Sequence, residues 1–309
     1  MNYFFSNWLD TSGETTKIIK YPSSQKIKDT LEETFKTQAE IIYSNFKNLT
    51  VFVSGGIDSQ VAALAFKKAN IPVEYVYLDM KFEGTPNITE RFFAIEFAKK
   101  YDIPLKILDI NYTKKQMLDT LHAENFFNLP FGYGSFLQSF FMKKYKNEHN
   151  KIPITGNIEL CYIREGRKCK AIFTDPNTGE TTNFIKNGNI SFYVFDPLIF
   201  QHYEHIHRNN EIYQYHLKFE PKNFAYNMLG FNFRKKIFSK EQHAKTKNDN
   251  NFTKINFGSD QMYGFVSEVD ILYDINCPDV RKKNEHKIMI RNKRSMVLYE
   301  FETTIEGFE

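Results

Sequence analysis

A short segment of the chain, Ser54-Gly55-Gly56-Ile57-Asp58-Ser59, combines residue types that can hold an oxyanion. Its two adjacent glycines lack Cβ atoms, so the backbone can turn tightly and bring N–H groups close to an anion. Ser54 and Ser59 add hydroxyl donors. Asp58 is the exception, because a carboxylate repels a phosphate unless a cation such as Mg²⁺ lies between them. The segment therefore predicts a phosphate site at which Asp58 holds Mg²⁺.

The elements on either side of this segment are those that a phosphate loop needs. Leu49–Val53 is an uncharged, β-branched run that predicts a buried strand, and Ser59–Lys68 predicts an Ala-rich helix. The N–H groups at the start of a helix have no intrahelical partner, so they favour an anion there. The chain lacks the G-x-x-x-x-G-K-[ST] motif, and Leu137 stands where a dinucleotide fingerprint starting at Gly132 would need a third glycine.

Strands and helices alternate through the first half of the chain, which predicts βαβ units around a Rossmann-like parallel sheet, an α/β fold. Ser23 or Ser24 is the expected cap of the first helix. The expected elements are, in chain order, helix Lys26–Phe46, strand Leu49–Val53, helix Ser59–Lys68, strand Val73–Leu78, helix Asn87–Lys100, strand Leu105–Ile110, helices Thr113–His122 and Ser135–Tyr145, and strand Ile152–Thr155.

The character of the sequence changes after Gly156, where short strand candidates alternate with turn signals. We expect an antiparallel meander there, within a smaller C-terminal α+β region, followed by a partly helical stretch from Pro197 and a final strand near the C-terminus. The meander strands expected are Lys170–Phe173, Thr181–Ile185 and Ile190–Phe195.

Composition excludes several classes of protein. The 309 residues carry 41 Lys and Arg against 37 Asp and Glu, and a net charge of +4 does not indicate a dedicated nucleic-acid binder. An aromatic share of 16% excludes a disordered chain. No apolar run approaches the ~20 residues of a membrane span, and the N-terminus lacks the pattern of a signal peptide. We therefore expect a cytoplasmic protein with no membrane partner.

The hexapeptide resembles the SGGxDS signature of the PP-loop, or N-type, ATP pyrophosphatases, with the strand and helix in the matching places. The resemblance covers about residues 48–160 and implies an adenine nucleotide alpha hydrolase-like fold. It also implies ATP and Mg²⁺, with cleavage of ATP to AMP and pyrophosphate. Most members of the family adenylate a carboxylate, carbonyl or amide oxygen, which a nitrogen or sulfur nucleophile then displaces.

A narrower resemblance is to stand-alone asparagine-synthetase-like PP-loop proteins of the kind common in bacteriophages, so the cytoplasm expected includes that of a host cell. Met1-Asn2 offers no N-terminal cysteine nucleophile, and no glutaminase domain fits. The resemblance implies three parts: 1–47, an N-terminal extension with a helix; 48–160, the ATP-binding α/β domain; and 161–309, a substrate-recognition or lid region.

The resemblance also assigns residues by position. Asp58 and Ser59 are the implied catalytic residues, and Asp58 is the implied Mg²⁺ ligand. Residues 78–80 would meet the adenine, 155–156 would lie across the nucleotide from the loop, and Glu159 is placed to reach the substrate or Mg²⁺. The implied ATP-binding residues are Val53, Ser54, Gly55, Gly56, Ile57, Asp58, Ser59, Leu78, Asp79, Met80, Thr155 and Gly156.

Two clusters beyond the loop have a chemical and a structural interpretation. Cys161 and Cys169 would form the thiol pair of a sulfur-transfer enzyme if a hairpin brought them together, although such cysteines are more often small buried apolar groups. His202, His205 and His207 lie close together in sequence, and a metal site would require their imidazoles to converge on one point. A solvated or substrate-facing helix is the more common setting for such histidines.

Three functions stay open at this level. The first is an adenylating enzyme that forms an amide or a nitrile, the latter as in 7-cyano-7-deazaguanine synthase. The second is a sulfur transferase acting on tRNA or a small molecule, which would need Cys161 or Cys169. The third is a module that senses ATP without turnover. Ile57 favours the first, because sulfonucleotide reductases and one thiolase branch commonly carry Lys there, and a small-molecule substrate is expected, with tRNA as the alternative partner.

Overall fold

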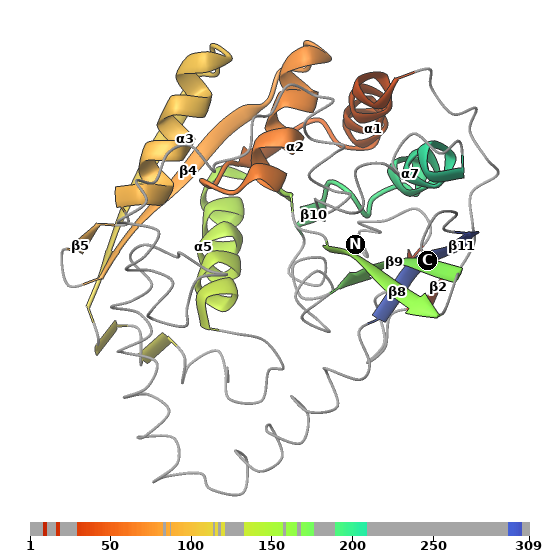
Figure 1. Cartoon of the computed structure of the whole chain (residues 1–309). Helices are drawn as coiled ribbons and strands as arrows, with labels where there is room; N and C mark the ends of the chain where they lie inside the picture. Colours follow the sequence, from red (N-terminus) through yellow and green to blue (C-terminus); the bar gives the residue numbers. More distant parts are fainter. Residues whose placement is uncertain are drawn as a thin grey trace, which may run out of the picture.

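A computed structural model shows a parallel sheet of five strands in the spatial order β10-β7-β3-β4-β6. Figure 1 labels its strands β4 and β10 and the helices that pack around the sheet. The strands are β3 (Leu49–Phe52), β4 (Glu74–Phe82), β6 (Leu105–Tyr112), β7 (Ile152–Thr155) and β10 (Ile190–Ser191). This is the strand order of a doubly wound sheet, so the predicted Rossmann-like fold class is confirmed. The residues described are 9–10, 17–18, 30–82, 85–86, 88–113, 115–116, 119–120, 133–156, 159–165, 168–175, 189–208 and 296–304.

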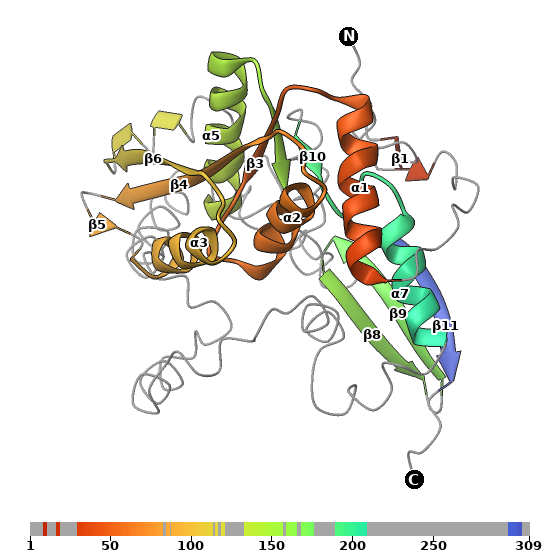
Figure 2. The same ribbon diagram turned by 90° about the horizontal axis from the view of Figure 1, so that it is seen from above.

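Helices cover both faces of this sheet. α2 and α3 lie on one face and α5 on the other, while α1 packs beside α2 and α7 packs beside α1 (Figure 2). The helices are α1 (Leu31–Asn45), α2 (Ile57–Lys68), α3 (Ile88–Lys100), α5 (Tyr133–His149) and α7 (Leu198–Arg208). None of the helices in the described part of the chain is both long enough and apolar enough to cross a bilayer.

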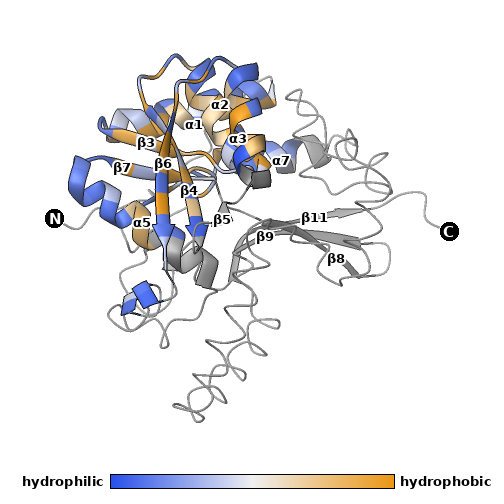
Figure 3. Ribbon diagram, turned by 90° about the vertical axis from the view of Figure 1, so that its left-hand side faces the viewer, coloured by the Kyte–Doolittle hydropathy of each residue, from blue (hydrophilic) through white to orange (hydrophobic). Residues whose placement is uncertain are grey.

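Alternate strand residues supply the two halves of the core. Val51 and Tyr75 face the larger cluster that contains α1, α2 and α7, whereas Phe52 and Val76 face Met142 of α5. This alternation is the period of a pleated strand with both faces covered. Apolar residues accordingly concentrate in the sheet and on the helices that face it (Figure 3).

The helices begin at other residues than the sequence predicts: α3 begins at Ile88 and α5 at Tyr133, and the starts of α1 and α2 have identifiable causes. α1 begins at Leu31, and its cap is Thr30, whose hydroxyl accepts a hydrogen bond from the Glu33 N–H at 3.2 Å, so neither Ser23 nor Ser24 caps it. α2 begins two residues before the predicted start, at Ile57, because Gly56 is extended (φ −75°, ψ 141°) and serves as its N-cap. This earlier start places Asp58 and Ser59 in the first turn of α2.

The predicted meander is wrong in its last strand. β8 (Glu159–Glu165), β9 (Lys168–Asp175) and β11 (Met296–Thr304) form an antiparallel sheet of their own. Ile190–Phe195 is not part of it, since β10 pairs in parallel with the open edge of β7, and an apolar run does not by itself specify its partner strand. The remaining expected strand, Thr181–Ile185, lies outside the described residues.

Short pairings complete the described sheets: β1 (Leu9–Asp10) with β2 (Lys17–Ile18), and β5 (Thr85–Pro86) with the end of β4, both antiparallel. Since β10 and α7 contribute to the same core cluster as α1 and α2, residues on both sides of position 160 build the central layer. The division into parts at 47 and 160 stays a prediction.

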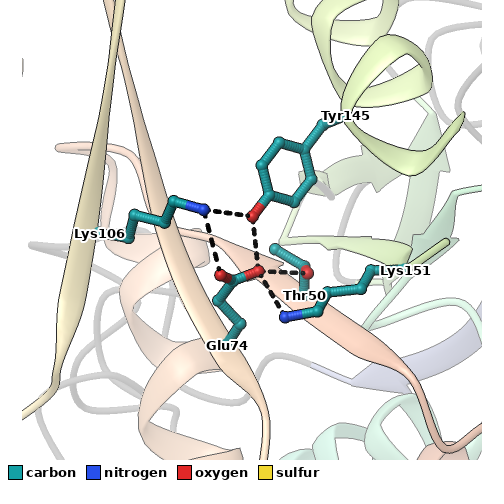
Figure 4. A network of polar contacts seen from close by, with 5 residues as sticks. All are labelled: Thr50, Glu74, Lys106, Tyr145 and Lys151. Atoms are coloured by element: carbon teal, nitrogen blue, oxygen red, sulfur yellow. Dashed lines mark hydrogen bonds and ion pairs between the residues drawn. The ribbon is translucent and has the colours of Figure 1, made fainter. Parts of the chain in front are cut away.

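A polar network ties α5 to the amino-terminal ends of the strands (Figure 4). The Glu74 carboxylate accepts hydrogen bonds from Tyr145 Oη at 2.6 Å, Lys151 Nζ at 2.9 Å and Thr50 Oγ1 at 3.2 Å, and Lys106 Nζ lies 3.5 Å away. Partial burial alone would raise the pKa of Glu74, but the bonds from Tyr145 and Lys151 outweigh burial and lower the pKa to about 2.

We expect Glu74→Gln to destabilise the protein by about 1–2 kcal/mol at pH 7, because the charge that Lys151 and Tyr145 hydrogen-bond is lost. Since the folded-state pKa is below the ordinary value, this contribution is present above about pH 4.5 and is lost as the pH falls towards 2. Urea unfolding at several pH values measures it. The exposed Glu96→Gln is the control, and equal effects of the two variants would contradict the prediction.

Candidate functional site

The Ser54–Ser59 loop is closed by its own serine hydroxyls. The Ser54 N–H donates to Ser59 Oγ at 2.9 Å, the Gly56 N–H donates to Ser54 Oγ at 3.0 Å, and Ser59 Oγ lies 2.8 Å from Gly56 O. Ser59 is buried, so its hydroxyl is a part of the loop's framework. The predicted catalytic role of Ser59 toward a ligand stays a prediction.

The first turn of α2 gives this loop the character of an anion site. The Gln60 N–H donates the first hydrogen bond of the helix, to Gly56 O at 3.3 Å. The backbone N–H groups that precede Gln60 in the first turn have no carbonyl of the helix to donate to. The positive end of the helix dipole adds to this effect. Asp58 lies in the same turn, which places a carboxylate beside the predicted phosphates.

Gly156 brings the end of β7 against this turn. A Cβ atom added at Gly156 would lie 2.5 Å from Asp58 O and 2.8 Å from Ser59 Cα, so only glycine permits the approach. β3 and β7 are adjacent parallel strands, and the chain order reverses between them. Ligands of doubly wound sheets bind at such a switch point, beyond the carboxyl ends of the strands, and this is where the structure brings Ser54–Ser59 and Thr155–Gly156 together.

Residues Leu78, Asp79 and Met80 continue β4 just beyond the level at which β3 ends, as the pair Phe52↔Val76 fixes. They do not share a face. Leu78 packs on the α5 side and lines an open cavity of about 610 Å³ with β6 and α5 residues, whereas Asp79 faces α3. No residue of the Ser54–Ser59 loop lines that cavity.

Asp79 is a buried acid. Its carboxyl group is 1% exposed, and Oδ2 lies 3.3 Å from Nε of Arg91. Burial raises the pKa of Asp79, with Asp109 adding to the rise and the charges of Arg91 and Lys81 opposing it. Glu159 begins β8 opposite Thr174, and its role toward substrate or Mg²⁺ stays a prediction.

Tyr193, which sequence reasoning missed, makes a hydrogen bond to the backbone of the loop. Its hydroxyl donates to Asp58 O at 3.1 Å, and its buried ring packs edge-on against Phe35 and Phe192. Tyr203 is also buried, and burial, with the nearby charge of Asp58, raises the pKa of its hydroxyl. No local motif marks either tyrosine, because both lie more than a hundred residues from the loop in sequence.

We expect Tyr193→Phe to weaken ATP binding about threefold to tenfold with little change in stability, since it removes the hydrogen bond that holds the Asp58 carbonyl. Calorimetric titration with ATP measures the effect. The control is Tyr75→Phe, because the buried Tyr75 hydroxyl has no hydrogen-bond partner among the described residues. A Tyr193→Phe variant that binds ATP as the control does would remove Tyr193 from the site.

The cysteine pair is not brought together by its hairpin. β8 and β9 do pair as antiparallel strands, but Cys161 lies opposite Ile172, and Cys169 lies opposite Arg164. Positions 169 and 172 are three residues apart, so the register puts the two cysteine positions on opposite faces of the sheet. The hairpin therefore gives no support to a thiol pair at these positions.

The partner of His202 in the structure is a threonine hydroxyl. It is buried on α7, with Nδ1 2.6 Å from Oγ1 of Thr34 on α1. Burial, with the neighbouring His205, lowers the pKa of His202 to about 4. Within the described ranges, no group of three His, Cys, Asp or Glu side chains could hold a metal ion.

We expect this histidine to make the protein less stable in acid. The folded-state pKa lies below the ordinary 6.5, so the contribution is complete above about pH 6.5 and is lost as the pH falls towards 4, by up to about 3 kcal/mol. Unfolding curves across this range should show the loss, and His202→Gln should remove most of it. His149→Gln, an exposed histidine, is the control, and the same pH profile in both variants would contradict the assignment.

Comparison with solved structures gives partial matches to two synthetases. An NMN synthetase from Francisella tularensis is 17% identical with a TM-score of 0.32, and the match covers 42% of this chain and 56% of that chain. An NH3-dependent NAD synthetase from Campylobacter jejuni is 18% identical with a TM-score of 0.30, over 41% and 55%. The chain thus matches little more than half the length of either. No family model matches the sequence, and the comparison with curated proteins gives no match.

Proposed function

We propose that this protein is an ATP pyrophosphatase of the PP-loop type, which adenylates a carboxylate or carbonyl oxygen of a small molecule for attack by a nitrogen nucleophile. The narrower proposal is an asparagine-synthetase-like enzyme. The observation that carries it is the position of the Ser54–Ser59 loop at the switch point of the sheet, with Gly156 packed against the first turn of α2.

The residues have distinct proposed roles. The loop N–H groups and the start of α2 stabilise the charge that develops on pyrophosphate as it leaves. Asp58 supplies one carboxylate, which together with phosphate oxygens and water makes the oxygen donor set that Mg²⁺ prefers. Bound there, Mg²⁺ would neutralise phosphate charge. Thr155 and Gly156 border the nucleotide on the β7 side, and residues 78–80 border its adenine.

The proposed reaction has two steps. A substrate oxygen bonds to the α-phosphorus of ATP as the bond from that phosphorus to pyrophosphate breaks. The nitrogen nucleophile then attacks the activated carbon, and AMP leaves with the oxygen. Ile57, which is apolar, and the register of Cys161 and Cys169 give no support to the sulfur-transfer alternative.

The test is the set of phosphorus products. The protein, ATP, Mg²⁺, ammonium and a panel of carboxylic acids are followed by ³¹P NMR, and AMP with pyrophosphate is expected for at least one acid. ADP with phosphate would contradict the proposal, and tight ATP binding without turnover for any acid would favour the sensor. Alkylation of the thiols should leave pyrophosphate release intact, and its loss would favour sulfur transfer.

A further inference from the structure

Arg91 and Asp79 form an unequal ion pair beside the candidate site. The Asp79 side chain is 1% exposed, whereas that of Arg91 is 46% exposed. Oδ1 of Asp79 is buried without a hydrogen-bond partner among the described residues. In that part of the chain, Arg91 is the one cation within ion-pair distance of this carboxylate. The nearby charges of Lys81 and Asp109 pair with each other.

The ion pair with Asp79 is closest at Nε of the guanidinium. Nε of Arg91 lies 3.3 Å from Oδ2 of Asp79, and this is the one ion pair that Arg91 makes with the described residues. The two terminal nitrogens carry four of the five N–H donors of the group, on a side chain that is 46% exposed. This is the arrangement in which an arginine can take a carboxylate or phosphate with two parallel hydrogen bonds.

The position of the pair connects it with the proposed nucleotide site. Asp79 lies just past the level at which β3 ends, and Arg91 lies in the fourth position of α3, the helix that follows β4. Both therefore lie toward the carboxyl ends of the strands, where the Ser54–Ser59 loop begins. A buried acid with one partner is costly to fold, which is more often accepted at a functional site than elsewhere.

We propose that Arg91 binds an oxyanion at this edge of the sheet and that Asp79 positions its guanidinium. The proposal rests on the proposed function, since it assigns the anion either to a phosphate of ATP or to a carboxylate or phosphate of the molecule that is activated. In both cases the group that Arg91 binds is an anion.

The experiment titrates the full-length protein with inorganic phosphate alone, with α,β-methylene-ATP, and with phosphate after saturation by that analogue. Arg91→Gln should weaken at least one of these by about tenfold or more, and Arg91→Lys, which keeps the charge without the planar fork, by less. Lys99→Gln, at the other end of α3, is the matched control and should bind within about twofold of the wild type.

The arms separate the two sources of the anion. Weaker binding of the analogue assigns Arg91 to a nucleotide phosphate, whereas loss of phosphate binding alone assigns it to the second substrate. Unchanged binding in every arm, or a wild type that binds neither probe, would overturn the inference. A wild type that binds phosphate through Arg91 but not the analogue would overturn the proposed function and leave the inference standing.

Asp79→Asn tests the positioning role. Burial disfavours the charged carboxylate, so the neutral variant should be at least as thermally stable as the wild type. It should nevertheless bind the affected probe several-fold more weakly, because the guanidinium is no longer held by a charge. A less stable variant with unimpaired binding would show a purely structural pair and would overturn the positioning role.

Discussion

Gly156→Ala is expected to lower pyrophosphate release by about 100-fold and to lower the free energy of unfolding by about 1–3 kcal/mol. The added Cβ would lie 2.5 Å from the Asp58 carbonyl oxygen, and the nearest atoms all belong to backbone, so no side-chain rotation relieves the clash. The first turn of α2 must move instead. A displacement of about 1 Å at a site that positions reacting groups costs about 100-fold in rate.

Gly56→Ala tests whether the loss of activity and stability is specific to position 156 or follows from replacing any glycine of the site. There the added Cβ would meet Ser54 Oγ at 3.0 Å, a side-chain atom that can shift at the cost of its hydrogen bonds with the Gly56 N–H and Ser59 Oγ. For Gly56→Ala we expect a smaller loss of stability than for Gly156→Ala, measured by thermal unfolding. Its pyrophosphate release should also fall by less than that of Gly156→Ala. If Gly156→Ala kept the wild-type rate, the strand end at β7 would have no part in the site.

The part of the site that could be predicted is the part that is local. A buried strand, a glycine pair and a helix are contiguous in sequence, so Ser54–Ser59 could be placed between β3 and α2 without knowledge of the rest. The sequence pattern places the start of α2 two residues too late, because the extended conformation of Gly56, and not an apolar period, decides it. That small error matters, since it moves Asp58 from the loop into the helix.

The contacts made at long range could not be predicted. Tyr193 reaches Asp58 only because β10 joins the parallel sheet beside β7, and the turn signals before Ile190 indicate a hairpin equally well. Arg91 has no motif around it, and the role proposed for it follows from the burial of its partner. Such a residue is recognised from the structure, because a buried carboxylate requires a cation nearby.

The stretch 78–80 shows a further limit of transferring a role along a strand. Three consecutive strand residues cannot present their side chains to one ligand, because neighbours point to opposite faces. Leu78 and Asp79 are accordingly separated by the sheet, one toward α5 and the other toward α3. An adenine beside this stretch would meet backbone and the side chains of one face only, and Arg91 is within reach of the Asp79 face.

Asp58→Asn is expected to reduce pyrophosphate release by about 1,000-fold at saturating ATP and Mg²⁺, because the carboxylate proposed to share Mg²⁺ with the phosphates becomes a neutral amide. The fold should survive. A carboxylate in the first turn of a helix contributes about 0.3–1 kcal/mol through the helix dipole, so the loss of stability should be small. Thermal unfolding and a coupled pyrophosphate assay measure the two effects.

The dependence on Mg²⁺ makes this prediction specific. Without Mg²⁺, Asp58 repels the phosphates, so Asp58→Asn should bind ATP as tightly as the wild type or more tightly. With Mg²⁺ the order should reverse, since only the wild type has the carboxylate that the metal needs. Asp102→Asn, which replaces an exposed aspartate after α3, should match the wild type in both conditions. If Asp58→Asn were weaker by the same factor with and without Mg²⁺, Asp58 would support the loop rather than the metal.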